Sequence, residues 1–194
     1  MTNRSIRRVL GTAGVLALAT LAAALPARAE VILHDRFDGS FSEDFEECGI
    51  PLHSDFAFRG TTHLRVGKGD LDSLFLLLLR IQTTDTITNP ANGKFLVIES
   101  NVLERDIHAS RVEGSVFEST SVESGQPFVV RDMNGDVVLR DRGSIAFTTL
   151  FDTLGDDIPG GELVAEVDVK VNGPHPGFFL NEDQFCGLVE DLIG

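Results

Sequence analysis

The sequence predicts an all-β domain, an antiparallel meander that closes into a barrel and ends in a short C-terminal helix. Three observations predict it: apolar and polar residues alternate along most of the chain, strong turn signals separate these stretches, and no helical period lies between them. A meander of about seven or eight strands protects its edges by closing into a barrel or by folding as a two-sheet β-sandwich. Because sequence neighbours are expected to be neighbours in space, the barrel is favoured and the sandwich is the alternative.

The first 29 residues have the three parts of a secretory signal peptide. A basic start with three arginines is followed by the uncharged apolar run Val9–Leu25 and by an Ala-x-Ala cleavage site just before Glu30. The apolar run is at the short edge of a membrane span, so an uncleaved anchor is the alternative. We therefore expect a secreted protein with residues 1–29 removed, residues 30–194 as one β domain, and no stable membrane span after cleavage.

Charge and aromatic content narrow the expected partners. The whole chain carries −14, and because the leader holds four arginines and no acid, the chain from Glu30 has 12 basic and 30 acidic residues, or −18. Nucleic acid is excluded as a partner on this ground, and a soluble monomer is expected. The 14 Phe with no Trp or Tyr favour a packed core over a sugar-stacking surface.

The expected strands follow one another with short turns between them. The turn signals are clearest at Asn89–Gly93 and at Asn134-Gly135, which is typical of a two-residue hairpin. The apolar run Leu74–Leu79 is expected to be buried on both faces at its start. Alternation in the last strand has one apolar exception, Val164. The strands are predicted at residues 56–66, 74–88, 95–108, 112–122, 127–132, 137–151 and 162–171.

The two ends of the domain differ from its middle. Residues 30–47 form an acidic N-terminal arm with Phe37, Phe41 and Phe45 at every fourth position, which we expect to dock on the domain. At residues 181–193 apolar side chains recur with a helical period, and Asn181 with Gln184 three residues later predicts a capping box.

Two cysteines, Cys48 and Cys186, are the only ones in the chain. In an exported protein two cysteines most simply form one disulfide, which here would join the region of Cys48 to the C-terminal helix. A reactive thiol or a metal ligand is the alternative, but no further Cys or His stands at ligand spacing beside either cysteine.

No common catalytic motif is present, and His175 is the weak catalytic candidate. Nucleophile elbow, phosphate loop and His-Glu-x-x-His helix are all missing, so an enzyme is not favoured and no cofactor is expected. In Gly173–Gly177 a proline stands on each side of His175, and such a rigid loop can present a general base or a ligand. The alternative is a turn that simply ends a strand.

Three charged residues share strand parity with apolar neighbours. If Arg80, Glu99 and Asp141 point inward, they form a polar cluster in which Arg80 needs Glu99 or Asp141 as a partner. Such a cluster can orient a ligand in a barrel mouth. Strand ends that emerge into water are the favoured alternative.

Two acidic groups are weak candidates for calcium. The Asp132-x-Asn134-x-Asp136 spacing opens like a calcium loop but lacks the later Gly and Glu, so a hairpin is preferred. A second group lies in an exposed loop, for which a solvated acidic loop is the alternative. Its members are Asp152, Asp156, Asp157 and Glu162.

The other histidines have surface explanations. His63 shares a strand face with Arg59 and Arg65, which a wet sheet face explains better than an anion site. His108 ends a strand near Glu104 and Asp106, where a surface ion pair is the simpler account.

Several short motifs in their order resemble a group of uncharacterised secreted β-proteins of high-GC Gram-positive, actinobacterial type. The resemblance spans nearly all of the domain and implies a single all-β domain whose two ends are held by a disulfide, with no known activity. The motifs are Cys48-Gly49, Thr88–Lys94, Leu139–Gly143, Asn172–Pro176 and Phe185-Cys186.

Three functions follow from these observations. The first is a non-catalytic barrel that binds a small apolar or amphipathic ligand in its mouth. The second is an enzyme of hydrolase or isomerase type that uses His175 with a carboxylate. The third is an extracellular structural or protein-interaction domain.

Overall fold

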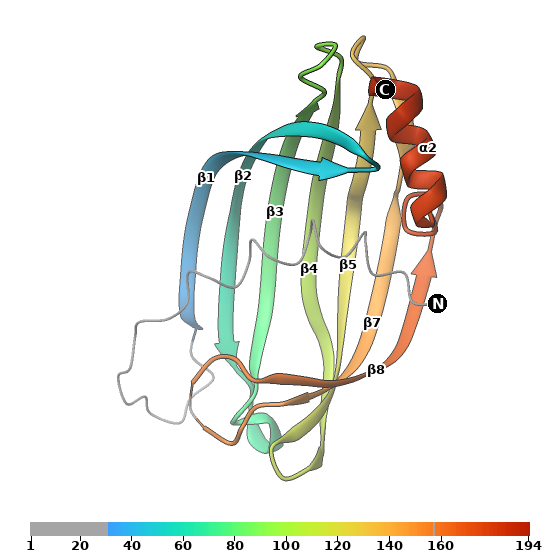
Figure 1. Cartoon of the computed structure of the whole chain (residues 1–194). Coiled ribbons are helices and arrows are strands. Elements are labelled where there is room, and N and C mark those ends of the chain that lie inside the picture. The colour runs from blue at the N-terminus through green and yellow to red at the C-terminus, as the bar shows by residue number, and fades with distance from the viewer. Residues whose placement is uncertain (1–30, 157) are drawn as a thin grey trace.

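A computed structural model describes residues 31–156 and 158–194, which form one antiparallel meander and one α-helix (Figure 1). The predicted leader, residues 1–29, and Asp157 lie outside the described residues. The strands are β1 Val31–Glu47, β2 Ile50–Val66, β3 Phe75–Thr88, β4 Phe95–Glu113, β5 Val116–Arg131, β6 Val137–Arg140, β7 Gly143–Asp152 and β8 Glu162–Asn172. The helix α2 spans Glu182–Ile193, and a short 3-10 helix, η1, spans Gly69–Leu71.

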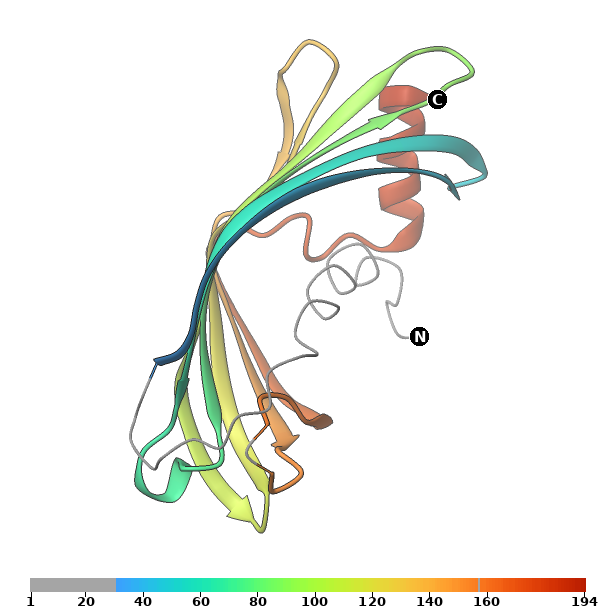
Figure 2. The same ribbon diagram turned by 90° about the vertical axis from the view of Figure 1, so that its left-hand side faces the viewer.

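The sheet is open, so the prediction of a closed barrel is wrong. Its strands follow the order β1-β2-β3-β4-β5-β7-β8, with β6 paired only to β5, and in the described chain β1 and β8 do not pair with each other. The two-sheet sandwich is also wrong, because these strands make one sheet. Figure 2 shows that the sheet bends along its strands toward the side on which α2 lies, rather than rolling round until its edges meet.

Strand boundaries differ from the predicted ones where a turn signal was weak. The acidic arm is a full strand, β1. Most of the two stretches predicted at 112–122 and 127–132 is one long strand, β5, while residues 112 and 113 end β4. The stretch predicted at 137–151 is divided into β6 and β7 at Asp141 and Arg142. The Asn134-Gly135 hairpin is present between β5 and β6, with the Gly135 amide donating to the Asp132 carbonyl at 2.9 Å.

Two bulges shape the open edge at β8. The register between β7 and β8 shifts between Thr148 and Thr149 and again between Leu150 and Phe151. Val167 and Val164 are the residues left without a partner, and both are more than half exposed. The apolar exception at Val164 is therefore a bulge, and such bulges also discourage pairing of an edge with another chain.

The two faces of the sheet differ in chemistry. We call the face that α2 covers at one end the α2 face, and the opposite one the polar face. Paired residues of antiparallel strands point to the same side, so the register assigns each side chain to a face. The packed core, a buried cluster on the α2 face beneath the helix, forms where Val189 and Ile193 pack on strand residues; its buried members are Leu52, Ile87, Leu96, Val130, Val189 and Ile193. Other buried apolar residues lie outside this cluster, among them Leu64, Val102, Phe117 and Ile145.

The C-terminal helix is fixed at both ends. Its predicted capping box is confirmed: the Asn181 side chain accepts from the Gln184 amide, and the Gln184 side chain accepts from the Asn181 amide. At the other end the Ile193 carbonyl accepts from Asn89 Nδ2 at 2.8 Å, and Lys94 Nζ donates to the Gly194 carbonyl at 2.8 Å. The turn between β3 and β4 thus satisfies carbonyls that the helix itself leaves open.

The predicted disulfide between Cys48 and Cys186 is confirmed, and it joins α2 to the turn between β1 and β2. That turn consists of Cys48 and Gly49, both with positive φ, 56° and 72°. Positive φ at both turn residues matches the twist of a two-residue hairpin. No helix in the described part of the chain is long and apolar enough to cross a membrane.

Candidate functional site

The α2 face carries a block of phenylalanines on β1 and β2, away from the packed core. Phe41 and Phe56 are a cross-strand pair with ring centroids 5.1 Å apart, and Phe56 lies 6.0 Å from Phe58 on the same strand. Phe58 in turn lies 6.2 Å from Phe37 of β1. Phe41 is 45 % exposed, so this aromatic block is not sealed off from solvent.

Two glycines make room for these rings. Phe37 pairs with Gly60, and Phe58 pairs with Gly39. A Cβ at Gly60 would lie 2.5 Å from the Phe37 ring, and one at Gly39 would lie 2.7 Å from the Phe58 ring. Each ring therefore lies flat over the glycine of the neighbouring strand, which widens the apolar surface that β1 and β2 present.

The apolar surface continues across β3. Leu77, Leu79 and Ile81 point to the α2 face, because Leu79 pairs with Thr62 and Ile81 with Gly60. All three leucine and isoleucine side chains are only partly buried. In the described chain no second layer of helix or strand covers this part of the sheet, since α2 packs at the other end.

A pair of carboxylates lies in the middle of the same face. Glu104 of β4 and Glu123 of β5 are directly paired, and their outer neighbours in the row are Leu79 and Ile145. Burial, and then the negative charge of Glu104, raise the pKa of Glu123 to about 7. Burial also raises the pKa of Glu104, with Asp106 adding to the effect. Such a pair binds a proton near neutral pH and can accept hydrogen bonds from, or neutralise, a cationic group.

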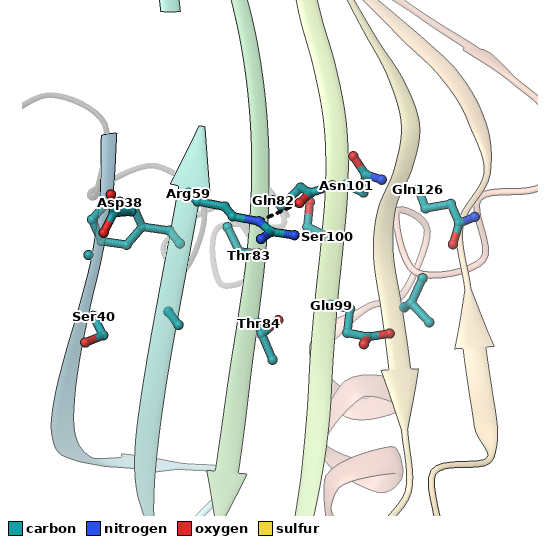
Figure 3. A pocket seen from close by; sticks show the side chains of 14 residues that line it. Asp38, Ser40, Arg59, Gln82, Thr83, Thr84, Glu99, Ser100, Asn101 and Gln126 are labelled. Carbon is teal, nitrogen blue, oxygen red and sulfur yellow. Dashed lines mark hydrogen bonds between the residues drawn. The ribbon is translucent and has the colours of Figure 1, made fainter. Parts of the chain in front are cut away.

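The polar face holds a separate hollow, the polar trough, of about 660 Å³ (Figure 3). Its walls come from β1 to β5 and carry hydroxyl, amide and charged groups. Arg59 Nε donates to Gln82 Oε1 at 2.8 Å, and Arg131 Nε donates to Glu99 Oε2 at 2.7 Å. The polar lining residues are Asp38, Ser40, Arg59, Gln82, Thr83, Thr84, Glu99, Ser100, Asn101 and Gln126. Of these, Thr83 and Ser100 are in the row of Phe58, so their side chains point to the α2 face.

The three residues predicted to form an inward polar cluster are not brought together. Glu99 lines the polar trough and is paired with Arg131. Arg80 is exposed on the same face, where it pairs with Leu103. Glu99 pairs instead with Thr84, which is four residues from Arg80 along β3, so Arg80 and Glu99 are separated by about 13 Å along the strands. Asp141 is buried at the β6–β7 corner, where it accepts from backbone amides.

His175 is enclosed at that same corner and lines no hollow. Its Nδ1 lies 3.9 Å from Asp141 Oδ2, beyond hydrogen-bond distance, and its side chain is fully buried. Its Nε2 lies 3.2 Å from the Asn172 carbonyl. Asp141 accepts instead from the amides of Gly177 and Phe178, at 2.7 and 3.0 Å. This geometry anchors the proline-rich loop to the sheet and gives a substrate no access to His175.

The acidic groups considered for calcium do not form a cation site among the described residues. Asp152 and Asp156 each accept from a backbone amide two residues on, as in Asx turns. Asp132 Oδ1 accepts from the Asn134 and Asp136 amides within its hairpin. The one group there with metal-ligand spacing contains Cys48 and Cys186, whose sulfurs form the disulfide.

Comparison with known protein families, with curated proteins and with solved structures finds no match for this chain. The resemblance to secreted actinobacterial β-proteins therefore stays a prediction. The aromatic block and the Glu104–Glu123 pair were missed as a site from the sequence. The Phe spacing was visible, but the partner of each ring depends on strand register.

Proposed function

We propose that this protein is a non-catalytic binding domain for an amphipathic ligand with a long apolar tail, held on the α2 face of the open sheet. The observation that carries this proposal is the aromatic block of Phe37, Phe41, Phe56 and Phe58, which lies outside the packed core. Large apolar side chains in a contiguous patch that no described helix or strand covers are typical of ligand and interaction sites. The proposal moves the ligand from a barrel mouth to an open, curved face.

The tail of the ligand is expected to lie across the strands. The apolar surface runs from the phenylalanines of β1 and β2 over Leu79 and Ile81 of β3. From β1 to β4 it spans three strand spacings, about 14 Å, and it ends at the Glu104–Glu123 pair. One end of this path is therefore aromatic and the other acidic.

The acidic end selects the head group. Neither the Glu104 nor the Glu123 side chain has a hydrogen-bond or ion-pair partner among the described residues, so both can accept from a ligand. A positively charged amine head group is favoured, because the two carboxylates offset its charge. A carboxylate head group is disfavoured, because it would add a third negative charge beside Glu104 and Glu123, which are poorly solvated. The proposed ligand class is a long-chain amine or another cationic amphiphile.

Displacement of a fluorescent apolar probe tests this proposal. We expect N-phenyl-1-naphthylamine to bind the chain from Glu30 saturably, with dodecylamine displacing it at lower concentration than dodecanoate. The double variant Phe56→Ala/Phe58→Ala should weaken probe binding at least tenfold. Phe179→Ala is the matched control, because Phe179 is 65 % exposed in the loop before α2.

The outcomes separate the parts of the proposal. Saturable binding that is lost in the double variant and kept in Phe179→Ala supports the aromatic block as the site. Absence of saturable probe binding, or equal affinity in all three proteins with unchanged circular dichroism, would overturn it. Equal displacement by the amine and the carboxylate would keep the apolar site but refute the acidic head-group selection.

A further inference from the structure

The polar face concentrates positive charge in a protein that is strongly acidic overall. Five arginines from four adjacent strands point to this face: Arg36 from β1, Arg59 and Arg65 from β2, Arg80 from β3 and Arg105 from β4. All five are exposed. We call these five residues the basic patch; the chain from Glu30 has only 12 basic residues against 30 acidic ones.

The register gives the size of the basic patch. Arg36 and Arg80 both pair with Thr61, from opposite sides, so they lie two strand spacings, about 10 Å, apart. Across β1 to β4 the patch spans about 14 Å, and from Arg59 to Arg65 along β2 it spans about 20 Å. This is the footprint of an extended polymer segment rather than of a single small anion.

The interior of the basic patch contains no acid. The positions between the arginines on the polar face are Thr61, His63, Leu76, Leu78 and Leu103. Glu104 and Asp106 point to the α2 face, since they pair with Leu79 and face Leu77. Asp38 is on the polar face at the margin of the basic patch, where it pairs with Arg59. Arg36, Arg80 and Arg105 form no ion pair with any other described residue. Clustered, unpaired like charges destabilise a folded protein through their mutual repulsion, and an anionic partner would remove this cost.

Two histidines extend the basic patch toward the sheet edge. His34 and His63 are a cross-strand pair whose rings stack with centroids 4.0 Å apart. They lie beside the row of Arg36 and Thr61. The stack fixes both imidazoles on the polar face, where they offer further hydrogen-bond donors to an anion.

The basic patch is continuous with the polar trough. Arg59 belongs to both, because it lines the trough and pairs with Gln82, whose side chain it contacts (Figure 3). Beyond Arg59 the trough offers hydroxyl and amide groups from Ser40, Thr84, Asn101 and Gln126. The trough also contains two carboxylates: Asp38, which pairs with Arg59, and Glu99, whose charge Arg131 offsets. A strip that begins with arginines and continues mainly with neutral hydrogen-bonding groups suits a partner that carries both anionic groups and hydroxyls.

We propose that the basic patch and the polar trough together bind an acidic polysaccharide, a sugar polymer that carries carboxylate groups. Arginine forks pair with carboxylates in a bidentate manner, and the trough supplies partners for sugar hydroxyls. Recognition is by charge and hydrogen bonds, without the aromatic stacking that Trp and Tyr would provide. Carboxylates more than about 8 Å from the bound polysaccharide are screened in physiological salt, so the acidic residues that oppose binding are the few near the strip, such as Asp38, which pairs with Arg59.

An anionic membrane fits this surface less well than a polymer. The polar face belongs to a sharply bent sheet (Figure 2), which touches a plane only along part of its area. In the basic patch Leu78 is the one large apolar side chain that is exposed, at 39 %, and it lies among long arginines that extend past it. No large apolar side chain there is placed to insert between lipids.

The test is binding of the chain from Glu30 to polygalacturonate, measured by calorimetry at low and at physiological salt. We expect saturable binding that weakens as salt rises, and no binding to neutral dextran. Arg80→Glu/Arg105→Glu should weaken it at least tenfold, and Arg80→Gln/Arg105→Gln by a smaller factor. Arg142→Glu is the matched control, because Arg142 is exposed at the β6–β7 corner, outside the basic patch.

Three results would overturn the proposal. They are no saturable binding to polygalacturonate, an equal loss of affinity in Arg142→Glu, and tighter binding to vesicles containing phosphatidylglycerol than to the polysaccharide. The last result would assign the basic patch to a membrane surface instead. Circular dichroism of each variant excludes misfolding as the cause of a loss, and the milder glutamine variants give a second measure of the same effect.

Discussion

Glu104 and Glu123 face each other across β4 and β5, and neither side chain has a described cation beside it. Burial, then repulsion by Glu104, raise the pKa of Glu123 to about 7 from its ordinary 4.5. The folded state therefore holds this proton more tightly than the unfolded chain. Stability from this group is complete below pH 4.5 and declines as pH rises toward 7.

Glu123→Gln should remove this decline. Because the neutral amide keeps its shape but cannot ionise, the variant should be more stable than the parent at pH 8, by up to about 3 kcal/mol. Near pH 4 the difference should vanish. Denaturant unfolding at pH 4, 6 and 8 measures it, with Glu113→Gln on the exposed end of β4 as control. An equal effect of Glu123→Gln at all three pH values would contradict the raised pKa.

The disulfide between Cys48 and Cys186 joins residues 138 positions apart and holds α2 to the β1–β2 turn. Its replacement in Cys48→Ala/Cys186→Ala should lower the free energy of unfolding by about 3 to 5 kcal/mol, because the unfolded chain regains the freedom of a long loop. Reductant should destabilise the parent and leave the variant unchanged. Intact mass without reductant should show the loss of two hydrogens, and two free thiols would refute the bond.

The turn between β3 and β4 stabilises the end of α2. Asn89 is buried and its Nδ2 donates to the Ile193 carbonyl, while its Oδ1 accepts from the Ala91 amide. Asn89→Ala should cost about 1 to 3 kcal/mol, since it removes two hydrogen bonds of a buried side chain, one to the Ile193 carbonyl and one from the Ala91 amide. Asn92 is exposed and its Nδ2 also donates to the Ile193 carbonyl, so Asn92→Ala should cost less. Thermal unfolding measures both, and equal losses would show that burial does not set the difference.

Local signals in the sequence predicted the local parts of this fold. The Asn134-Gly135 hairpin, the Asn181 capping box and the pairing of Cys48 with Cys186 all depend on a few neighbouring residues or on simple counting. The open sheet could not be predicted in this way. Whether β1 meets β8 depends on bend and twist summed over all strands, and the bulges at Val164 and Val167 become visible only when β8 is paired with β7.

The candidate sites depended on register for the same reason. Glu104 and Glu123 stand 19 positions apart, and no local pattern places them opposite each other. Arg36, Arg80 and Arg105 likewise come from three strands, and the alternation within each strand shows only that they share one side of it. A shift of one residue in any pairing would move such side chains to the other face. Parity along single strands therefore suggested a cluster of Arg80, Glu99 and Asp141 that the register separates.

Asp141 gives a test of the role of the proline-rich loop. Both of its carboxylate oxygens accept from loop amides, Oδ1 from Gly177 and Oδ2 from Phe178, and the side chain is almost fully buried. Asp141→Asn turns one acceptor into a donor that faces an amide. We expect a loss of about 1 to 3 kcal/mol in unfolding free energy, because one buried amide loses its partner.

Hydrogen exchange at the two amides separates this structural role from a catalytic one. In the parent, Gly177 and Phe178 should exchange slowly, and in Asp141→Asn at least one of them should exchange much faster. Asp191→Asn, at an exposed position on α2, should leave stability and both exchange rates unchanged. If Asp141→Asn changed neither the stability nor the two exchange rates, the carboxylate would not hold the loop in place. A catalytic role for Asp141 beside His175 would then be the alternative.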